Sequence, residues 1–264
     1  MSDVTSLPLT PRQREILRQA RDHGFATVEA LAARLGVSAQ TVRREIIRLT
    51  QAGLLQRFHG GAGVGNAGGG SDASVRLGYS QKRTVAPQAK DLIGARLAAL
   101  VPEGASVFLD VGTTVEAVAR ALRGHRRLRV FTSSLPAAML LAGREGLEVA
   151  VTGGMVRGAD GSLVGSDVTE AVARLRVDFG VIGCSGFDDD GAPMDFDLQK
   201  IAAKQAVIAR ARQAVVVADA GKFARSAVVR IAPPDAFALL VSDAAPPAAL
   251  AARLAEAGVR VLAG

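Results

Sequence analysis

The sequence predicts an α/β protein with two parts: an N-terminal winged helix-turn-helix and a C-terminal, Rossmann-like, mostly parallel sheet. Two observations predict this fold. Three short helical patterns and a hairpin fill residues 1–62, and from residue 106 onward apolar strand-like runs alternate with helical stretches. The stretch between them is rich in glycine, serine and alanine and has almost nothing to bury. We therefore expect domains at 1–62 and 79–264, joined by a flexible linker at 63–78.

The N-terminal part begins with two helices whose start signals are local. Thr10 and Gln13 are spaced as a capping box around a proline at the first helical position, and this helix should stop near residues 23–24. Thr27 is placed to cap a second helix. Gly36 can end that helix in the left-handed conformation, and Ser38 can cap a third one directly afterwards. This spacing predicts a helix, a tight turn and a helix.

The third helix has an apolar side and a basic side. Val42, Ile46 and Leu49 recur at helical spacing and form one stripe, while the arginines project elsewhere. Residues 54–58 then alternate like a strand and run into a glycine-rich turn at 59–62, which completes the hairpin. Residues 1–61 hold nine arginines and no lysine against five acidic residues, an excess of four positive charges. Arginine suits phosphate because its planar fork donates two hydrogen bonds.

A winged helix-turn-helix places its third helix in the major groove of DNA. We expect double-stranded operator DNA as the partner, with Arg48, Arg57 and His59 on the backbone and the earlier residues on bases and nearby phosphates. The alternative is a three-helix interaction module that never meets DNA. The expected DNA-binding residues are Ser38, Gln40, Thr41, Arg43, Arg44, Arg48, Arg57 and His59.

The C-terminal part follows a polar, basic segment at residues 79–88. Continuous apolar strands that alternate with helices are typical of a parallel sheet covered by helices on its faces. We expect strands at 106–109, 128–131, 147–151, 179–182, 214–217 and 237–241, with helices at 90–100, 114–122, 198–212 and 248–257.

Small, hydroxylated and charged residues follow five of these strands. Because the carboxyl ends of parallel strands meet at one edge, we expect a small-ligand site there. Gly112, Thr113 and Thr114 precede a helix whose first amides could bind an anion, with Lys222 as a countercharge. The alternative for this loop is a plain capping box between Thr113 and Glu116. Asp110 and Asp219 suit hydroxyl groups, so the mixture favours a phosphorylated polyol or sugar.

Composition excludes several other classes of protein. The chain is 49% hydrophobic over 264 residues, has no apolar run of bilayer length and lacks the order of a secretory signal, so we expect a cytoplasmic protein with no membrane partner. The single cysteine, Cys184, excludes an intramolecular disulfide and a cysteine-cluster zinc site. Three dispersed histidines form no metal spacing, and we expect no metal or cofactor.

Three N-terminal segments resemble the DNA-binding domain of DeoR-family bacterial transcriptional repressors. They are residues 14–17, the run Ser38-x-x-Thr41-Val42-Arg43-Arg44, and residues 53–62, which read Gly-x-Leu-x-Arg-x-His-Gly-Gly-Ala. Glu45 departs from the pattern, since the family usually has aspartate there. Residues 108–122, 151–165 and 177–222 resemble the effector domain of the same family, which is related in fold to sugar-phosphate isomerases.

The resemblance implies effector-responsive positions at Lys82, Arg83, Lys90, Asp219 and Lys222, although the family usually shows arginine before lysine at the first two. Likeness of residues 110–119, 178–180, 194–198 and 219–223 and of Lys204 to a family member implies glycerol 3-phosphate as the effector. The candidate effector-binding residues are therefore Asp110, Gly112, Thr113, Thr114, Thr132, Ser133, Gly153, Gly154, Lys82, Arg83, Lys90, Lys204, Asp219 and Lys222.

These observations predict a non-enzymatic repressor, a homodimer or homotetramer that leaves its operator when it binds a phosphorylated metabolite. One alternative is a sugar-phosphate isomerase or deaminase with an appended DNA-binding module. We weigh against it because no histidine or glutamate occupies the strand ends, where proton transfer at carbon would need a base. A second alternative keeps DNA binding but makes the protein an activator.

Overall fold

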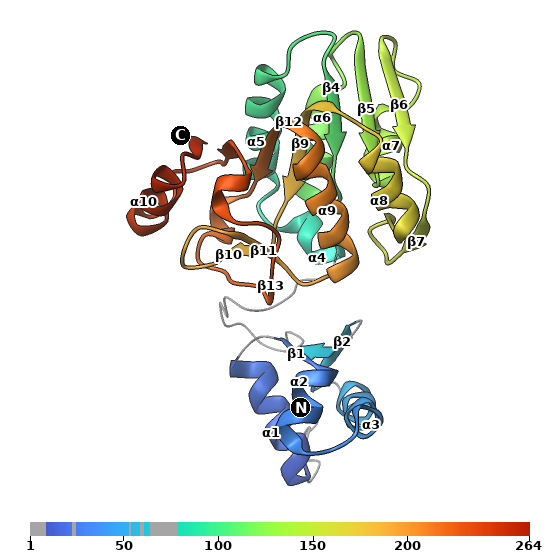
Figure 1. Ribbon diagram of the computed structural model, residues 1–264, viewed down its shortest axis with the longest axis vertical. Helices are drawn as coiled ribbons and strands as arrows, with labels where there is room; N and C mark the ends of the chain where they lie inside the picture. The colour runs from blue at the N-terminus through green and yellow to red at the C-terminus, as the bar shows by residue number, and fades with distance from the viewer. Residues whose placement is uncertain (1–8, 23–24, 53, 59–60, 64–78) are drawn as a thin grey trace, which may run out of the picture. The chain divides into compact units, whose positions relative to one another are not determined.

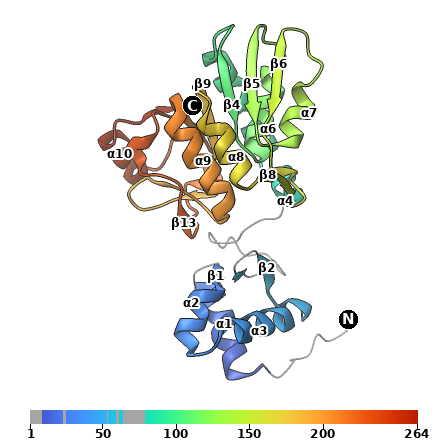
Figure 2. The ribbon, with the colours of Figure 1, turned by 45° about the vertical axis from the view of Figure 1, so that its right-hand side comes forward.

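The computed structural model describes residues 9–22, 25–52, 54–58, 61–63 and 79–264. The chain divides into two compact units, Met1–Arg76 and Leu77–Gly264, each of which has its own elements (Figures 1 and 2). The predicted DNA contact His59 lies outside the described residues, as do residues 64–78 of the predicted linker and the predicted helix end at residues 23–24. Gly63, predicted as the first linker residue, belongs to a strand instead, because it pairs with Phe25 and Gln56.

The N-terminal unit is a winged helix-turn-helix. Its helices are α1 (Pro11–Asp22), α2 (Val28–Leu35) and α3 (Ala39–Gln51), and its strands are β1 (Phe25–Thr27), β2 (Gln56–Phe58) and β3 (Gly61–Gly63). The strands form an antiparallel sheet in the order β1-β3-β2. β1 was not predicted, because three residues are too few to show a period. The apolar stripe of α3 is buried in a core of its own with α1, α2 and Leu55.

Local capping explains where these helices begin. The Thr10 amide donates to Gln13 Oε1 (3.0 Å) and the Gln13 amide donates to Thr10 Oγ1 (3.2 Å), which confirms the predicted capping box. Gly36 has φ +63°, as a left-handed turn requires, and Ser38 Oγ accepts the Thr41 amide (3.2 Å) at the start of α3. The turn between α2 and α3 therefore depends on short-range contacts.

The C-terminal unit is built on a seven-stranded parallel sheet in the order β15-β14-β12-β9-β4-β5-β6. The unit also has two small antiparallel sheets. One is the hairpin of β7 (Met155–Arg157) with β8 (Ser162–Val164), and the other consists of β10 (Gly186–Phe187), β11 (Pro193–Asp195) and β13 (Val229–Arg230). The large sheet consists of β4 (Ser106–Leu109), β5 (Leu128–Thr132), β6 (Leu147–Val151), β9 (Val177–Gly183), β12 (Ala211–Val217), β14 (Leu239–Val241) and β15 (Arg260–Leu262).

Helices cover both faces of this sheet, because its central strands are apolar on both sides. Val107 and Leu109 of β4 pack with α5, α6 and α7, while Phe108 between them packs with α8 and α9 on the other face. α10 extends that second layer over β12 and β14. The helices are α4 (Tyr79–Thr84), α5 (Pro87–Leu100), α6 (Thr113–Leu122), α7 (Leu135–Leu141), α8 (Ser166–Ala173), α9 (Leu198–Arg210) and α10 (Ala248–Glu256).

The predicted strands and helices are present, with corrected ends. The helix predicted at 198–212 stops at Arg210, because Ala211 already pairs with Val177 in the sheet. The strands at 179–182 and 214–217 are longer than predicted, and the one at 237–241 is shorter. The polar segment at 79–88, for which no helix was predicted, contains α4 and the start of α5. The helices α7 and α8 were missed because each spans only seven or eight residues.

Candidate functional site

The N-terminal unit presents one face of α3 to solvent. Gln40, Arg43, Arg44 and Arg48 are exposed and Thr41 is half-buried, so the predicted basic side lies on the outside. The Ser38 hydroxyl caps α3, and it lies 2.9 Å from the Thr41 hydroxyl. Arg57 lies on β2, in the predicted wing. The face combines amide, hydroxyl and guanidinium groups, which are the groups that contact base edges and phosphates.

Glu45 fixes how α3 packs on α1. Its carboxylate is 7% exposed and accepts a hydrogen bond from Gln13 Nε2 (2.7 Å). Arg48 Nη1 lies 3.2 Å from the other carboxylate oxygen. The same side chain therefore bridges two helices and holds one arginine of the exposed face. Glutamate, which stands where the family usually has aspartate, reaches both partners here.

The second site lies where the strand order of the large sheet reverses. β4 and β9 are neighbours, but the chain continues from β4 to β5 and β6 on one side, whereas β12, β14 and β15 lie beyond β9. Ligands of open parallel sheets bind outside the carboxyl ends of strands at such a point. Asp110 follows β4 and accepts a hydrogen bond from the Gly183 amide at the end of β9 (3.0 Å). This bond ties the two loops together.

A buried charge network supports these loops. Lys204 of α9 is 2% exposed, and its Nζ forms an ion pair with Asp110, donates to the Gly183 carbonyl (2.7 Å) and lies 3.4 Å from Asp195. Burial alone would raise the pKa of Asp195, but the Lys204 ammonium and hydrogen bonds outweigh it and hold that pKa below its ordinary value. Burial would lower the pKa of Lys204, but Asp110 and Asp195 raise it. Lys204 and Asp195 are therefore held in their charged forms.

Asp219 is the unpaired member of this edge. It follows β12, is 4% exposed, and its Oδ2 has no hydrogen-bond partner among the described residues. A buried carboxylate oxygen without a donor is unfavourable unless something outside the chain donates to it. Lys222, one turn further on, is half-buried. Asp219 and Lys222 both lie close enough to Lys90 of α5 to influence its pKa, which burial lowers and Asp219 raises. The strand-end loops therefore face α5.

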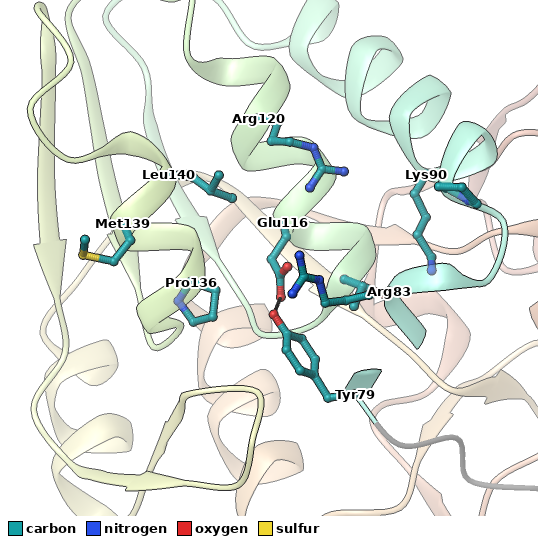
Figure 3. A pocket seen from close by; sticks show the side chains of 10 residues that line it. Tyr79, Arg83, Lys90, Glu116, Arg120, Pro136, Met139 and Leu140 are labelled. Atoms are coloured by element: carbon teal, nitrogen blue, oxygen red, sulfur yellow. Dashed lines mark hydrogen bonds between the residues drawn. The ribbon is translucent and has the colours of Figure 1, made fainter. Parts of the chain in front are cut away.

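A cavity of about 480 Å³ opens between α4, α5, α6 and α7 (Figure 3). Three of its side chains are basic, Arg83, Lys90 and Arg120, and one is the carboxylate of Glu116. Figure 3 shows the Tyr79 phenol pointing at Glu116, with Arg83 beside them. The cavity is lined by Tyr79, Arg83, Pro87, Lys90, Thr113, Glu116, Arg120, Pro136, Met139 and Leu140.

The loop before α6 is not a capping box. Gly112 occupies the N-cap position with φ +118° and supplies no side-chain cap, and Thr113 is already helical. Glu116 accepts a hydrogen bond from the Tyr79 hydroxyl (3.0 Å), and Thr113 Oγ1 lies 3.4 Å from the Lys82 carbonyl. The capping-box alternative is therefore wrong. The first turn of α6 contacts α4 instead.

Some of the predicted effector residues lie at the strand ends or line the cavity, and the others have different positions. Asp110, Gly112, Thr113, Thr114, Asp219 and Lys222 lie together at the strand ends, and Arg83, Lys90 and Thr113 line the cavity. Others have internal roles: Thr132 Oγ1 donates to the Leu109 carbonyl (2.6 Å), the Ser133 carbonyl accepts the Leu163 amide (2.7 Å), and Gly154 packs on Val164 too closely for a Cβ atom. Gly153 is exposed in the loop after β6, and Lys82 contributes its carbonyl.

Four polar or charged residues of the sensor-unit sites were not predicted as site residues: Tyr79, Glu116, Arg120 and Asp195. The apolar lining residues Pro87, Pro136, Met139 and Leu140 were not predicted either. Glu116 also corrects the argument that no glutamate lies near the strand ends, because it is one turn into α6. A signal existed for Tyr79, the single tyrosine of the chain, since it stands in a polar segment with no other aromatic residue. Its partner is 37 residues away and could not be inferred from spacing.

Tyr79 should titrate well above free tyrosine. Burial, followed by the hydrogen bond to Glu116 and its negative charge, raises the pKa of the phenol from 10.0 to about 12. The folded protein then holds this proton more tightly than the unfolded chain, so its stability should fall as the pH rises from 10 towards 12. Ultraviolet absorbance at rising pH reads this one group, because the chain has no other tyrosine and no tryptophan. A midpoint near 10 in the folded protein would contradict the Tyr79–Glu116 contact.

Neither membrane insertion nor a metal centre is visible in the described part of the chain. No helix there is long and apolar enough to cross a bilayer. Those same residues contain no group of three histidine, cysteine or acidic side chains arranged to hold a metal ion.

Two family models match the chain: "DeoR-like helix-turn-helix domain" over residues 12–67 and "DeoR C terminal sensor domain" over residues 85–244. The glycerol-3-phosphate regulon repressor of Haemophilus influenzae is 38% identical over 220 residues, which are 83% of this chain and 84% of that protein. The glycerol-3-phosphate regulon repressor of Escherichia coli K12 is 33% identical over 90% of this chain and 92% of that protein. Ribose 5-phosphate isomerase A of Methanocaldococcus jannaschii is similar over 52% of this chain and 54% of its own, with 16% identity and a TM-score of 0.39.

Proposed function

The chain belongs to the DeoR family of transcriptional regulators, and we propose that it is a cytoplasmic repressor released from its operator by a phosphorylated polyol. The observation that carries the ligand class is the buried carboxylate oxygen of Asp219 that has no partner among the described residues, in a side chain whose charge acts on Lys90 at the wall of the basic cavity. A ligand hydroxyl can donate to that oxygen, whereas a phosphate cannot. Because the relatives at 33–38% identity are named as glycerol-3-phosphate regulon repressors, glycerol 3-phosphate is our proposed effector.

The acidic and basic side chains of the site would bind different ends of a phosphorylated polyol. Asp219 would take a hydroxyl, and Lys90 and Lys222 would bind the phosphate together with the first amides of α6. Gly112 as an N-cap without a side chain leaves those amides open to a ligand. Lys204 and Asp110 would hold the loops in place, because each is already occupied by the other.

Alanine in place of Asp219 or Lys222 tests this proposal. Operator affinity without ligand should stay within about twofold of the parent, because both residues lie in the sensor unit, whereas release by glycerol 3-phosphate should be lost. Fluorescence anisotropy of labelled operator DNA measures affinity and release, and calorimetry measures ligand binding directly. Arg212→Ala is the matched control, because Arg212 is exposed on β12, the strand that precedes Asp219. Normal release in both test variants would remove these residues from the site.

The enzymatic alternative keeps one supporting observation. Burial raises the pKa of Glu116, and a carboxylate with a raised pKa in a cavity is typical of general acid–base groups. Against turnover, Glu116 already accepts the Tyr79 hydroxyl, and Lys204 is surrounded by its own acceptors. Steady product formation from ribose 5-phosphate or a related sugar phosphate, absent in Glu116→Gln, would favour the enzyme; no product is our expected result.

We also propose that the chain works as a homo-oligomer joined along the β6 edge of the sheet. β6 is the outermost strand on that side, next to α7 and β7 (Figure 1). Large apolar side chains are exposed on these elements: Met139 (77%), Met155 (73%), Val156 and Val151. Exposed apolar groups that gather on one side mark an interaction surface. Light scattering should show a smaller assembly for Met155→Glu with Val156→Glu, and an unchanged assembly for the double change would exclude this edge.

A further inference from the structure

We propose that α4 is a latch on the effector site: its carboxyl end occupies the groups that bind the phosphate, and an incoming phosphate displaces it. This inference rests on the proposed function, because it concerns the same cavity. α4 is held by three sets of contacts. Tyr79 donates to Glu116, Thr113 lies against the Lys82 carbonyl, and Lys90 Nζ donates to the carbonyls of Lys82 and Val85.

The end of α4 resembles an anion to the groups around it. The last carbonyls of a helix carry partial negative charge and need donors. Lys90 donates to two carbonyls at this end, those of Lys82 and Val85. Lys90 is 4% exposed and lines the cavity, so its amino group is a buried donor at the cavity wall. Thr113 also lines the cavity and begins α6. The two donors that suit a phosphate are therefore bonded to carbonyls in α4 and just after its end.

A phosphate should win this competition for two reasons. The Lys90 ammonium attracts a phosphate oxygen more strongly than a carbonyl oxygen, because the phosphate carries full negative charge and the carbonyl only a partial one. The Thr113–Lys82 contact is also long at 3.4 Å, so little is lost when the hydroxyl turns to a better acceptor. After Lys90 and Thr113 have moved to the ligand, the Tyr79–Glu116 bond still joins α4 to α6, so this bond resists the release.

The position of α4 in the chain gives its release a consequence. α4 begins at Tyr79, directly after residues 64–78, which connect the DNA-binding unit to the sensor unit. Because α4 is the first helix of the sensor unit after that connecting stretch, its release changes where the stretch is attached to the sensor unit. A ligand can shift this equilibrium because it binds the released state better than the latched one.

Tyr79 reports on the latch without a label, because the chain has one tyrosine and no tryptophan. A phenol that is hydrogen-bonded to a carboxylate emits weakly, since the excited phenol passes its proton to the carboxylate. Titrating the full-length protein with glycerol 3-phosphate should therefore raise tyrosine emission, in step with binding measured by calorimetry. Tyr79→Phe supplies the blank for this signal.

The variants test whether the latch controls release. Tyr79→Phe and Glu116→Gln weaken it, so operator should be released at about tenfold lower glycerol 3-phosphate, the factor expected when a hydrogen bond to a charged group is lost. Glu145→Gln is the control, as Glu145 is exposed before β6, at the amino end of that strand and away from the strand-end loops. The latch is excluded if glycerol 3-phosphate binds and releases operator while tyrosine emission stays constant and both variants release operator at the same ligand concentration as the parent. The proposed function would still stand in that case. Absence of binding in calorimetry would overturn both.

Discussion

Changing both Arg43 and Arg44 to alanine should lower operator affinity by about 100-fold or more, since each good arginine contact to DNA contributes about 1–3 kcal/mol. Both side chains are exposed on the face of α3 opposite its buried stripe, in the first half of the helix, which is the part of a recognition helix that reaches base edges. Single changes should each have part of this effect. Anisotropy titrations with promoter DNA at several salt concentrations provide the measurement.

The salt dependence separates the two kinds of contact. An arginine on a phosphate should reduce the slope of log affinity against log salt by about one when it is removed, whereas an arginine on a base should weaken binding with the slope nearly kept. Arg260→Ala is the control, because Arg260 is exposed on β15 in the other unit. Parent-like affinity in the Arg43, Arg44 double variant would favour the interaction-module alternative over DNA recognition.

Lys204→Met should destabilise the sensor unit by about 3–5 kcal/mol, because removing one member of a buried ion pair leaves the other charges without compensation. Asp110 and Asp195 would face each other with no cation between them, and the Gly183 carbonyl would lose its donor. Methionine keeps the length and apolar stem of lysine, so the loss reports the charge. Urea unfolding followed by far-ultraviolet circular dichroism measures the difference.

Two further variants make this result specific. Arg210→Met removes an exposed cation from the last turn of the same helix and should change stability by less than about 0.5 kcal/mol. Adding Asp110→Asn to Lys204→Met should recover part of the loss, since the uncompensated carboxylate is then neutral. If Lys204→Met were as stable as the parent, the network would contribute nothing to the fold.

Sequence alone predicted the elements whose signals are local or repeated. The caps at Thr10 and Ser38 depend on contacts three residues apart, and the apolar stripe of α3 shows its own period. The strands of the large sheet are visible because they are buried on both faces and therefore apolar throughout. Short elements escaped: β1 has three residues and α4 has six, too few for a period to appear.

The sites were predicted in part, for a related reason. Parallel strands bring their carboxyl ends to one edge, so the strand-end loops could be grouped without knowing any contact. What each side chain touches depends on pairs far apart in the chain, such as Lys204 with Asp110, 94 residues away, and Tyr79 with Glu116. No spacing rule links such pairs. Lys90 and Lys204 were therefore predicted as ligand contacts, and only the structure shows the chain's own acceptors around both.

The two units have separate hydrophobic cores, and every residue of the core around α1, α2 and α3 comes from the first 62 positions. A mutation in the core of one unit should therefore leave the folding stability of the other unit unchanged. A duplicated gene could drift towards a new metabolite while its operator stays the same, or acquire a new operator while answering the same nutrient. Such independence allows one inherited layout to diversify into many regulators.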